Sequence, residues 1–217
     1  MFGPGSELTD GQGAVMDSGI LAALLMLMAA PALAQDKNSA FTVYAGYRDG
    51  GSFTDVDSDE KLSLDSSAAG SLALDFGLDA SRQWQIFLSH QSTEMKLKGT
   101  SAAAGESLDL SVTYLHFGGT NYFSGPVGKG AYVVGGLGAT VFEPDSGFDT
   151  ELRASLNLGI GYQVPLGETI ALRFEGRGYA TLVNSSGGLF CSGGCVISIE
   201  GDVFTQGELM LGLSARF

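Results

Sequence analysis

The chain has 217 residues, of which 44% are hydrophobic and 33 are glycine, and its formal net charge is −13. This hydrophobic content excludes a disordered chain, and the glycines lack the three-residue period of collagen. Acidic residues outnumber basic residues by 24 to 11. Nucleic-acid-binding proteins normally present a basic face to phosphates, so we expect no nucleic-acid partner.

Residues 1–34 have the pattern of an export signal. An apolar run covers 20–30, and the small residues of Pro31-Ala-Leu-Ala34 follow it, which predicts cleavage after Ala34. No Lys or Arg precedes the run, so Met16 is an alternative start. A short buried helix is the competing interpretation of the run, which is too short to span a membrane as a helix.

The two cysteines agree with export. Cys191 and Cys195 are separated by three small residues, Ser-Gly-Gly, which allow the chain to fold back and bring the sulfurs together. We expect a loop disulfide in an oxidising compartment. A zinc site would need two further ligands, and His90 and His116 are distant in sequence, so we expect no metal and no cofactor.

The remainder, residues 35–217, alternates polar and apolar residues in segments of about ten residues or more, which is typical of transmembrane β-strands. A soluble β-sandwich also alternates, but its strands are usually shorter. Short and longer connections follow one another, as the periplasmic turns and extracellular loops of such barrels do. We expect eight strands, at 41–48, 61–77, 83–97, 108–123, 131–142, 151–163, 170–182 and 199–217.

Three of these segments carry specific expectations. The second is expected to place Leu62, Leu64, Leu72, Leu74 and Phe76 on one apolar face. The fourth begins with the apolar face of Leu108, Leu110, Val112 and Tyr114 and loses its alternation at 115–117, where we expect a β-bulge. The fifth is so rich in Gly and Val that its two faces stay unassigned.

Charged residues of the last three segments all fall on one side of their strands, which leaves the other side uncharged and suited to lipid. The charged side is expected to face the lumen, where both signs of charge favour a salt-bridged plug over an open pore. The expected lumenal charges are Arg48, Asp75, Glu151, Arg153, Arg173, Glu175, Arg177, Glu200, Asp202, Glu208 and Arg216.

The leader, the eight amphipathic segments and the terminal run Leu209-Met-Leu-Gly-Leu-Ser-Ala-Arg-Phe217 resemble the small bacterial outer-membrane β-barrel proteins of the OmpA/OmpX-like superfamily. The resemblance implies an all-β fold, an eight-stranded antiparallel up-and-down barrel in the outer membrane. It implies that Phe217 presents the last strand to the barrel-assembly machinery. Members of the superfamily include structural proteins, adhesins, conduits and lipid-modifying enzymes, so the fold leaves the function open.

Two polar motifs need separate interpretations. His90 and Ser92 share one side of the third segment, and this His-x-Ser spacing resembles the lipid A deacylase barrels, in which His takes the proton of an attacking Ser. Glu94 lies too far along the strand to orient His90, which favours polar residues at the membrane interface instead. Residues 55–60 begin like a calcium loop but lack its Gly and its closing Glu, which indicates a solvated acidic loop.

We therefore predict a monomeric, non-enzymatic outer-membrane barrel with a plugged polar lumen and a structural or surface-interaction role. Its expected surroundings are outer-membrane lipid and lipopolysaccharide, with an extracellular partner at the loops. A narrow conduit or binder for a small ligand is the first alternative. A lipid A-modifying hydrolase that uses His90 and Ser92 is the second.

Overall fold

The computed structural model describes residues 38–54, 61–98, 107–123, 125–145, 149–183 and 203–217. The expected leader, the expected acidic loop at 55–60 and both cysteines lie outside these residues. Within the described parts of the chain no helix is long and apolar enough to cross a membrane. The strands are β1 (Ala40–Arg48), β2 (Ser52–Thr54), β3 (Lys61–Leu64), β4 (Ser67–Gly77), β5 (Arg82–Lys98), β6 (Ser107–Tyr122), β7 (Gly130–Pro144), β8 (Glu151–Pro165), β9 (Ile170–Leu182) and β10 (Val203–Arg216).

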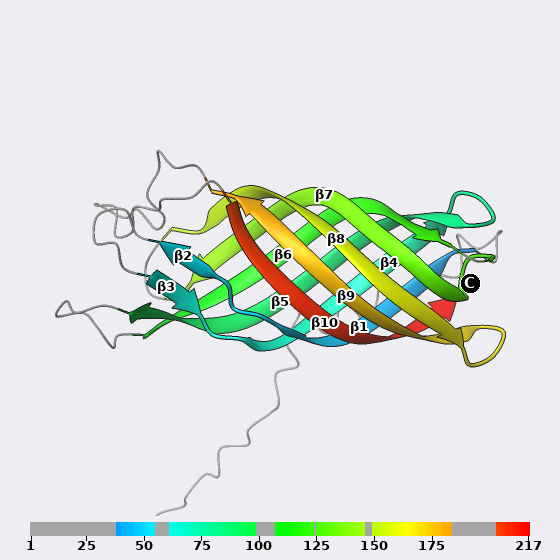
Figure 1. The fold of residues 1–217 in the computed structure, drawn as a ribbon, viewed down its shortest axis with the longest axis horizontal. Helices are drawn as coiled ribbons and strands as arrows, with labels where there is room; N and C mark the ends of the chain where they lie inside the picture. Colours follow the sequence, from blue (N-terminus) through cyan, green and yellow to red (C-terminus); the bar gives the residue numbers. More distant parts are fainter. Residues whose placement is uncertain (1–37, 55–60, 99–106, 124, 146–148, 184–202) are drawn as a thin grey trace, which may run out of the picture. The chain divides into compact units, whose positions relative to one another are not determined.

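Eight of these strands form a closed antiparallel barrel, as the sequence predicts (Figure 1). Neighbours in sequence pair around the ring from β4 to β10, and β1 pairs with both β4 and β10. Closure leaves no unpaired strand edge in the ring, which is the condition for placing a sheet in lipid. The short strands β2 and β3 extend the sheet beyond β5 at one end.

The two ends of the barrel differ. The connections 78–81, 123–129 and 166–169 lie at one end, together with the start of β1 and the end of β10; we call this the turn end. Strands β5 and β9 end at the opposite end of the barrel, which we call the loop end (Figure 1). Pro144 and Pro165 are the last residues of β7 and β8, where a missing N–H disturbs no ladder.

Side chains alternate between lipid and lumen along each strand. Val43, Tyr47, Leu158, Ile160 and Leu209 are among the exposed apolar residues of the outer face. Their inward neighbours are buried, among them Thr42, Arg48, Asn157 and Glu208. The two-residue period of the sequence therefore separates the faces as expected over most of the barrel.

The second expected strand is interrupted, which corrects the placement of Leu64. Leu64 pairs with Met95 and Ala69 pairs with Gln91, so five steps along one strand oppose four along the other. Because of this extra residue near Asp65 and Ser66, even-numbered residues face the lumen before the interruption and lipid after it. Leu64 is consequently buried, whereas Leu72 and Leu74 face outward and are half-buried.

The expectation for the fourth segment is also wrong. Its register with β5 and β7 is continuous through 115–117, so the strand contains no bulge there. Leu110, Val112 and Tyr114 point into the barrel and are almost fully buried, while Leu115 and Phe117 face lipid. Alternation of polarity fails here because the lumen itself is apolar at this level.

The glycines of β6 and β7 allow these two strands to approach closely. A Cβ atom at Gly118 would lie 1.9 Å from the carbonyl oxygen of Gly135 on the opposite strand. Only glycine avoids such a collision. The high glycine content that left the faces of β7 unassigned in the sequence is therefore required by backbone packing. The buried, inward-facing residues of β7 are Tyr132, Val134, Thr140 and Phe142.

The turn between β4 and β5 is organised by Asp79. Its Oδ1 accepts hydrogen bonds from the backbone N–H groups of Ser81 and Arg82, both at 2.9 Å, and its Oδ2 accepts one from Nε of Arg82 at 2.6 Å. The Ser81 amide, followed by the Arg82 side chain, lowers the pKa of Asp79 to about 2. These bonds favour the ionised carboxylate, because each donates to its negative oxygens.

This geometry predicts a pH dependence of barrel stability. A carboxylate whose folded pKa is depressed stabilises the fold above its unfolded pKa near 4, and that contribution is lost as pH falls towards about 2. Asp79→Asn should remove this part of the pH dependence. The measurement is the temperature at which the folded band is lost in SDS electrophoresis at pH 7, 4 and 2, and identical profiles for both proteins would contradict the assignment.

Candidate functional site

Six charged side chains are buried inside the barrel. They come from β1, β4, β9 and β10, three are basic and three are acidic, and each is at most 3% exposed: Arg48, Asp75, Arg173, Glu175, Arg177 and Glu208. A buried charge without a partner is strongly destabilising, so their pairing determines whether this lumen is stable.

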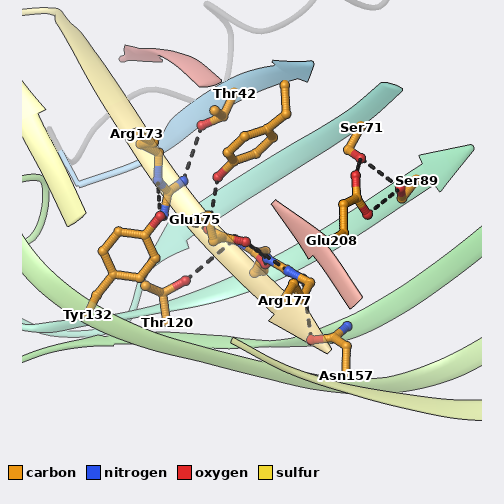
Figure 2. A network of polar contacts seen from close by, with 12 residues as sticks. Thr42, Ser71, Ser89, Thr120, Tyr132, Asn157, Arg173, Glu175, Arg177 and Glu208 are labelled. Carbon is orange, nitrogen blue, oxygen red and sulfur yellow. Dashed lines mark hydrogen bonds and ion pairs between the residues drawn. The ribbon is translucent and has the colours of Figure 1, made fainter. Parts of the chain in front are cut away.

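Arg173 and Asp75 connect β9 and β4, which are not neighbours in the ring. Nη1 of Arg173 lies 2.6 Å from Oδ2 of Asp75 and also donates to the Thr42 hydroxyl at 3.2 Å. Nε of Arg173 donates to the Tyr132 hydroxyl at 3.2 Å (Figure 2). The second carboxylate oxygen of Asp75 accepts a hydrogen bond from Gln85 at 2.7 Å. The pair is therefore held by strands β1, β4, β5, β7 and β9 together.

Glu175 is bonded through both of its oxygens. Oε1 accepts Nε and Nη2 of Arg177 at 2.8 and 2.5 Å, and Oε2 accepts the hydroxyls of Tyr132 at 2.7 Å and Tyr44 at 3.2 Å (Figure 2). The guanidinium of Arg177 also lies 3.6 Å from the centroid of the Phe87 ring. Phe87 thus faces a cation inside the barrel.

Arg48 and Glu208 form a second ion cluster. Nε of Arg48 donates to Oε2 of Glu208 at 3.1 Å, and the Tyr179 hydroxyl donates to the same oxygen at 2.6 Å. Nη2 of Arg48 also bonds Ser89. The Arg48 guanidinium lies about 5 Å from the ring centroids of Tyr114 and Tyr179, which stack at 4.3 Å. Hydrogen bonds and aromatic rings together compensate the burial of this pair.

An apolar layer completes the filling of the lumen. Phe142 and Phe204 meet edge to face with centroids 5.9 Å apart. They belong to one buried cluster with Leu110, Val112 and Val183. Most of these residues lie near the ends of strands that enter or leave the loop end.

The other expected lumenal charges occupy different places. Arg153 pairs with Glu151 at 2.6 Å near the loop end, and both side chains are partly exposed. Arg216 reaches the turn end, where its Nη2 donates to the carbonyl of Glu168 at 2.9 Å. Glu200, Asp202 and the expected disulfide of Cys191 and Cys195 lie outside the described residues.

The sequence interpretation missed the aromatic partners of the ion clusters. Tyr44 and Tyr132 both donate to Glu175, but tyrosine is uncharged, so the pattern of charges in the sequence does not identify either residue. Tyr44 could have been assigned to the lumen, because it alternates with the lipid-facing Val43 and Ala45. The ambiguous composition of β7 gave no such signal for Tyr132.

His90 and Ser92 lie on the outer wall of β5, where both are exposed. Ser92 Oγ is 3.5 Å from His90 Nε2, and His90 Nδ1 is 2.9 Å from Thr113 Oγ1 on β6. The structure therefore brings the two expected residues together. The group that contacts Nδ1 of His90 is the hydroxyl of Thr113. Hydrolases with a Ser and a His usually orient the His with a carboxylate instead.

A cavity of about 440 Å³ lies directly beside Ser92. It is lined by Asp65, Ser66, Ser67, Ser92, Thr93, Glu94, Asp109, Leu110, Ser111 and Asp145. Hydroxyl and carboxylate groups dominate this lining, and none of these ten residues is basic. The sequence did not indicate the cavity, because its residues come from several strands and from separate loops.

Removing the charge of Glu175 should test the ion clusters. Glu175→Gln would leave the Arg177 guanidinium buried without its counter-ion, which costs about 3–5 kcal/mol when one partner of a buried pair is removed. The free energy of unfolding would be measured in urea by the fluorescence of Trp84, the single tryptophan. Glu168→Gln, at an exposed turn position, is the control, and equal losses in the two variants would disprove a stabilising role.

Comparison with known proteins agrees with the barrel. The family model described as outer membrane protein beta-barrel domain matches residues 20–217. Similar solved structures include Neisserial surface protein A, with 11% identity, a TM-score of 0.49 and coverage of 83% of this chain and 97% of that chain. The Yersinia pestis protein Ail, in complex with the heparin analogue sucrose octasulfate, has 17% identity, a TM-score of 0.42 and coverage of 83% and 99%. The outer membrane protein AlkL has 13% identity, a TM-score of 0.45 and coverage of 85% and 92%.

No curated protein matches the sequence significantly. The family match covers most of the chain, including every strand of the barrel. The chain belongs to the outer membrane protein β-barrel family and is a bacterial outer-membrane protein.

Proposed function

We propose that this protein has a structural or surface-interaction role in the outer membrane and that its lumen is plugged. The observation that carries this proposal is the set of six buried charges, which form three ion pairs inside the lumen at 2.5–3.0 Å. One of these pairs, Arg173 with Asp75, joins strands that are not neighbours in the ring. Passage of a solute through the barrel would require these buried pairs to separate. Breaking buried pairs is costly, so the arrangement favours a closed barrel.

Function then resides on the surface of the protein. The β2–β3 hairpin and the long strand β5 extend the sheet at the loop end, where extracellular partners would be met. At the opposite end, the N–H of Phe217 donates to the carbonyl of Ser39 at 3.0 Å. We propose that the barrel-assembly machinery recognises the C-terminal strand, including Phe217. We also propose that the barrel is a monomer.

The plug predicts an absence of conductance. The protein reconstituted in a planar lipid bilayer should give no stable current steps, because the lumen is blocked by the paired charges and by Phe142 and Phe204. A porin inserted in the same bilayer is the positive control. Reproducible steps of constant size would overturn the plug and support the narrow conduit.

A lipid A-modifying hydrolase is the second candidate, favoured by the contact between Ser92 and His90. In this reaction Ser92 Oγ would attack an acyl ester carbon as its proton moves to His90 Nε2. The leaving alcohol would take that proton, and water would then release the acyl group from Ser92. Thr113, bonded to Nδ1, would hold the ring in place.

The hydrolase is tested by mass spectrometry of lipid A from cells that express the protein. Activity would appear as loss of an acyl chain, and Ser92→Ala would restore the full mass, because it removes the nucleophile without altering the lumen. Thr205→Ala, which removes an exposed hydroxyl from β10 away from the cavity, is the control. Unchanged lipid A in the presence of the wild-type protein would eliminate this candidate.

A further inference from the structure

The apolar band around the barrel is uneven. On β8 the outward residues from Leu152 to Val164 are apolar, whereas on β5 the apolar series Trp84, Ile86 and Leu88 ends at His90. The eight steps from Arg82 to His90 rise about 21 Å if each adds about 3.4 Å at a tilt near 40°, which is less than an apolar band of about 25 Å. Polar residues of β5 therefore begin within the upper edge of the lipid.

These polar residues form a continuous strip across β5 and β6. His90 is paired with Thr113 and Ser92 with Ser111 across the two strands, and all four face outward. Hydrogen bonds link Ser92, His90 and Thr113. A strip of this kind is poorly matched to acyl chains, so it requires headgroups or water at its level.

The 440 Å³ cavity continues this strip towards the loop end. Ser92 and Ser111 belong to both, and beyond them the lining adds the carboxylates of Glu94, Asp109 and Asp145. A ligand that rises from the lipid would therefore meet hydroxyls first and negative charge next. An unsubstituted phosphate would be repelled by these carboxylates, whereas an ammonium group would be attracted.

The spacing of the acidic groups argues against a directly held metal. Within the described residues no three His, Cys, Asp or Glu side chains converge closely enough to coordinate an ion. Carboxylates and hydroxyls distributed around a cavity suit a larger ligand that carries several hydrogen-bonding groups and a positive charge. Because Ser92 and Ser111 belong both to the cavity lining and to the outward-facing strip, we expect this ligand to be part of a lipid.

We propose that the cavity and strip bind the headgroup of an outer-leaflet lipid that combines sugar hydroxyls with an amine, as an amino-sugar-substituted lipid A does. The hydroxyls of Ser92, Ser111 and Thr113 bond the sugar and phosphate oxygens. Glu94 and Asp109, which face each other on β5 and β6, bind the ammonium group. The hydroxyls and carboxylates that would bind this headgroup occupy outward-facing positions of β5 and β6, apart from the paired charges of the lumen. The inference goes beyond the proposed function.

The experiment compares two lipids on the folded barrel. The full protein in phosphatidylcholine nanodiscs receives lipid A with or without an aminoarabinose substituent, and native mass spectrometry measures the lipid that each protein retains. We expect at least fivefold greater retention of the substituted lipid. The double variant Glu94→Gln and Asp109→Asn should retain both lipids equally, because it removes the charge and keeps similar side-chain shapes.

Controls separate binding from folding. Glu168→Gln, at the turn end, should behave like the wild type, and heat-dependent migration in SDS electrophoresis establishes that each variant is folded. Equal retention of the two lipids by the wild type would overturn the proposal, since charge would then not be recognised. Retention of unsubstituted lipid A only when calcium is added would also overturn it, in favour of a divalent bridge.

Discussion

The pairing of β1 with β10 is the constraint on which the rest of the structure depends. Nine residues of β1 pair with β10 on one side and with β4 on the other, and this closes the sheet. Without closure, backbone groups of both edge strands would face lipid with no hydrogen-bond partner. Closure also creates the enclosed lumen, into which every second side chain must fit.

The lumen is stabilised by a combination of charge and aromatic packing. Each buried guanidinium is paired with a carboxylate, and the rings of Phe87, Tyr114, Tyr132 or Tyr179 lie against it. Tyrosine hydroxyls satisfy the carboxylate oxygens that arginine leaves free, as Tyr44 and Tyr132 do at Glu175. The polar interior is therefore a connected network of ion pairs, tyrosine hydroxyls and aromatic rings.

The outer wall has a different organisation on its two sides. β8 presents a long apolar face to lipid, but β5 and β6 present histidine, serine and threonine where the apolar series ends. The ion pairs inside the lumen and the polar place on the outer wall together make the lipid interface and the adjoining cavity the surface of interest. That location also contains Ser92 and His90, so one small surface accommodates both the lipid-binding proposal and the hydrolase candidate.

The sequence by itself determined the strand count, the closed antiparallel barrel and the face of most strands, because a two-residue period separates lipid from lumen wherever the lumen is polar. It failed at Leu64, where one extra residue changes the register, and at Leu110, Val112 and Tyr114, where the lumen is apolar. Only the tertiary structure decided which charges pair, since Arg173 and Asp75 lie 98 positions apart and meet across the ring. The cavity beside Ser92 likewise exists only after the pairing of β4, β5, β6 and β7 brings its residues together.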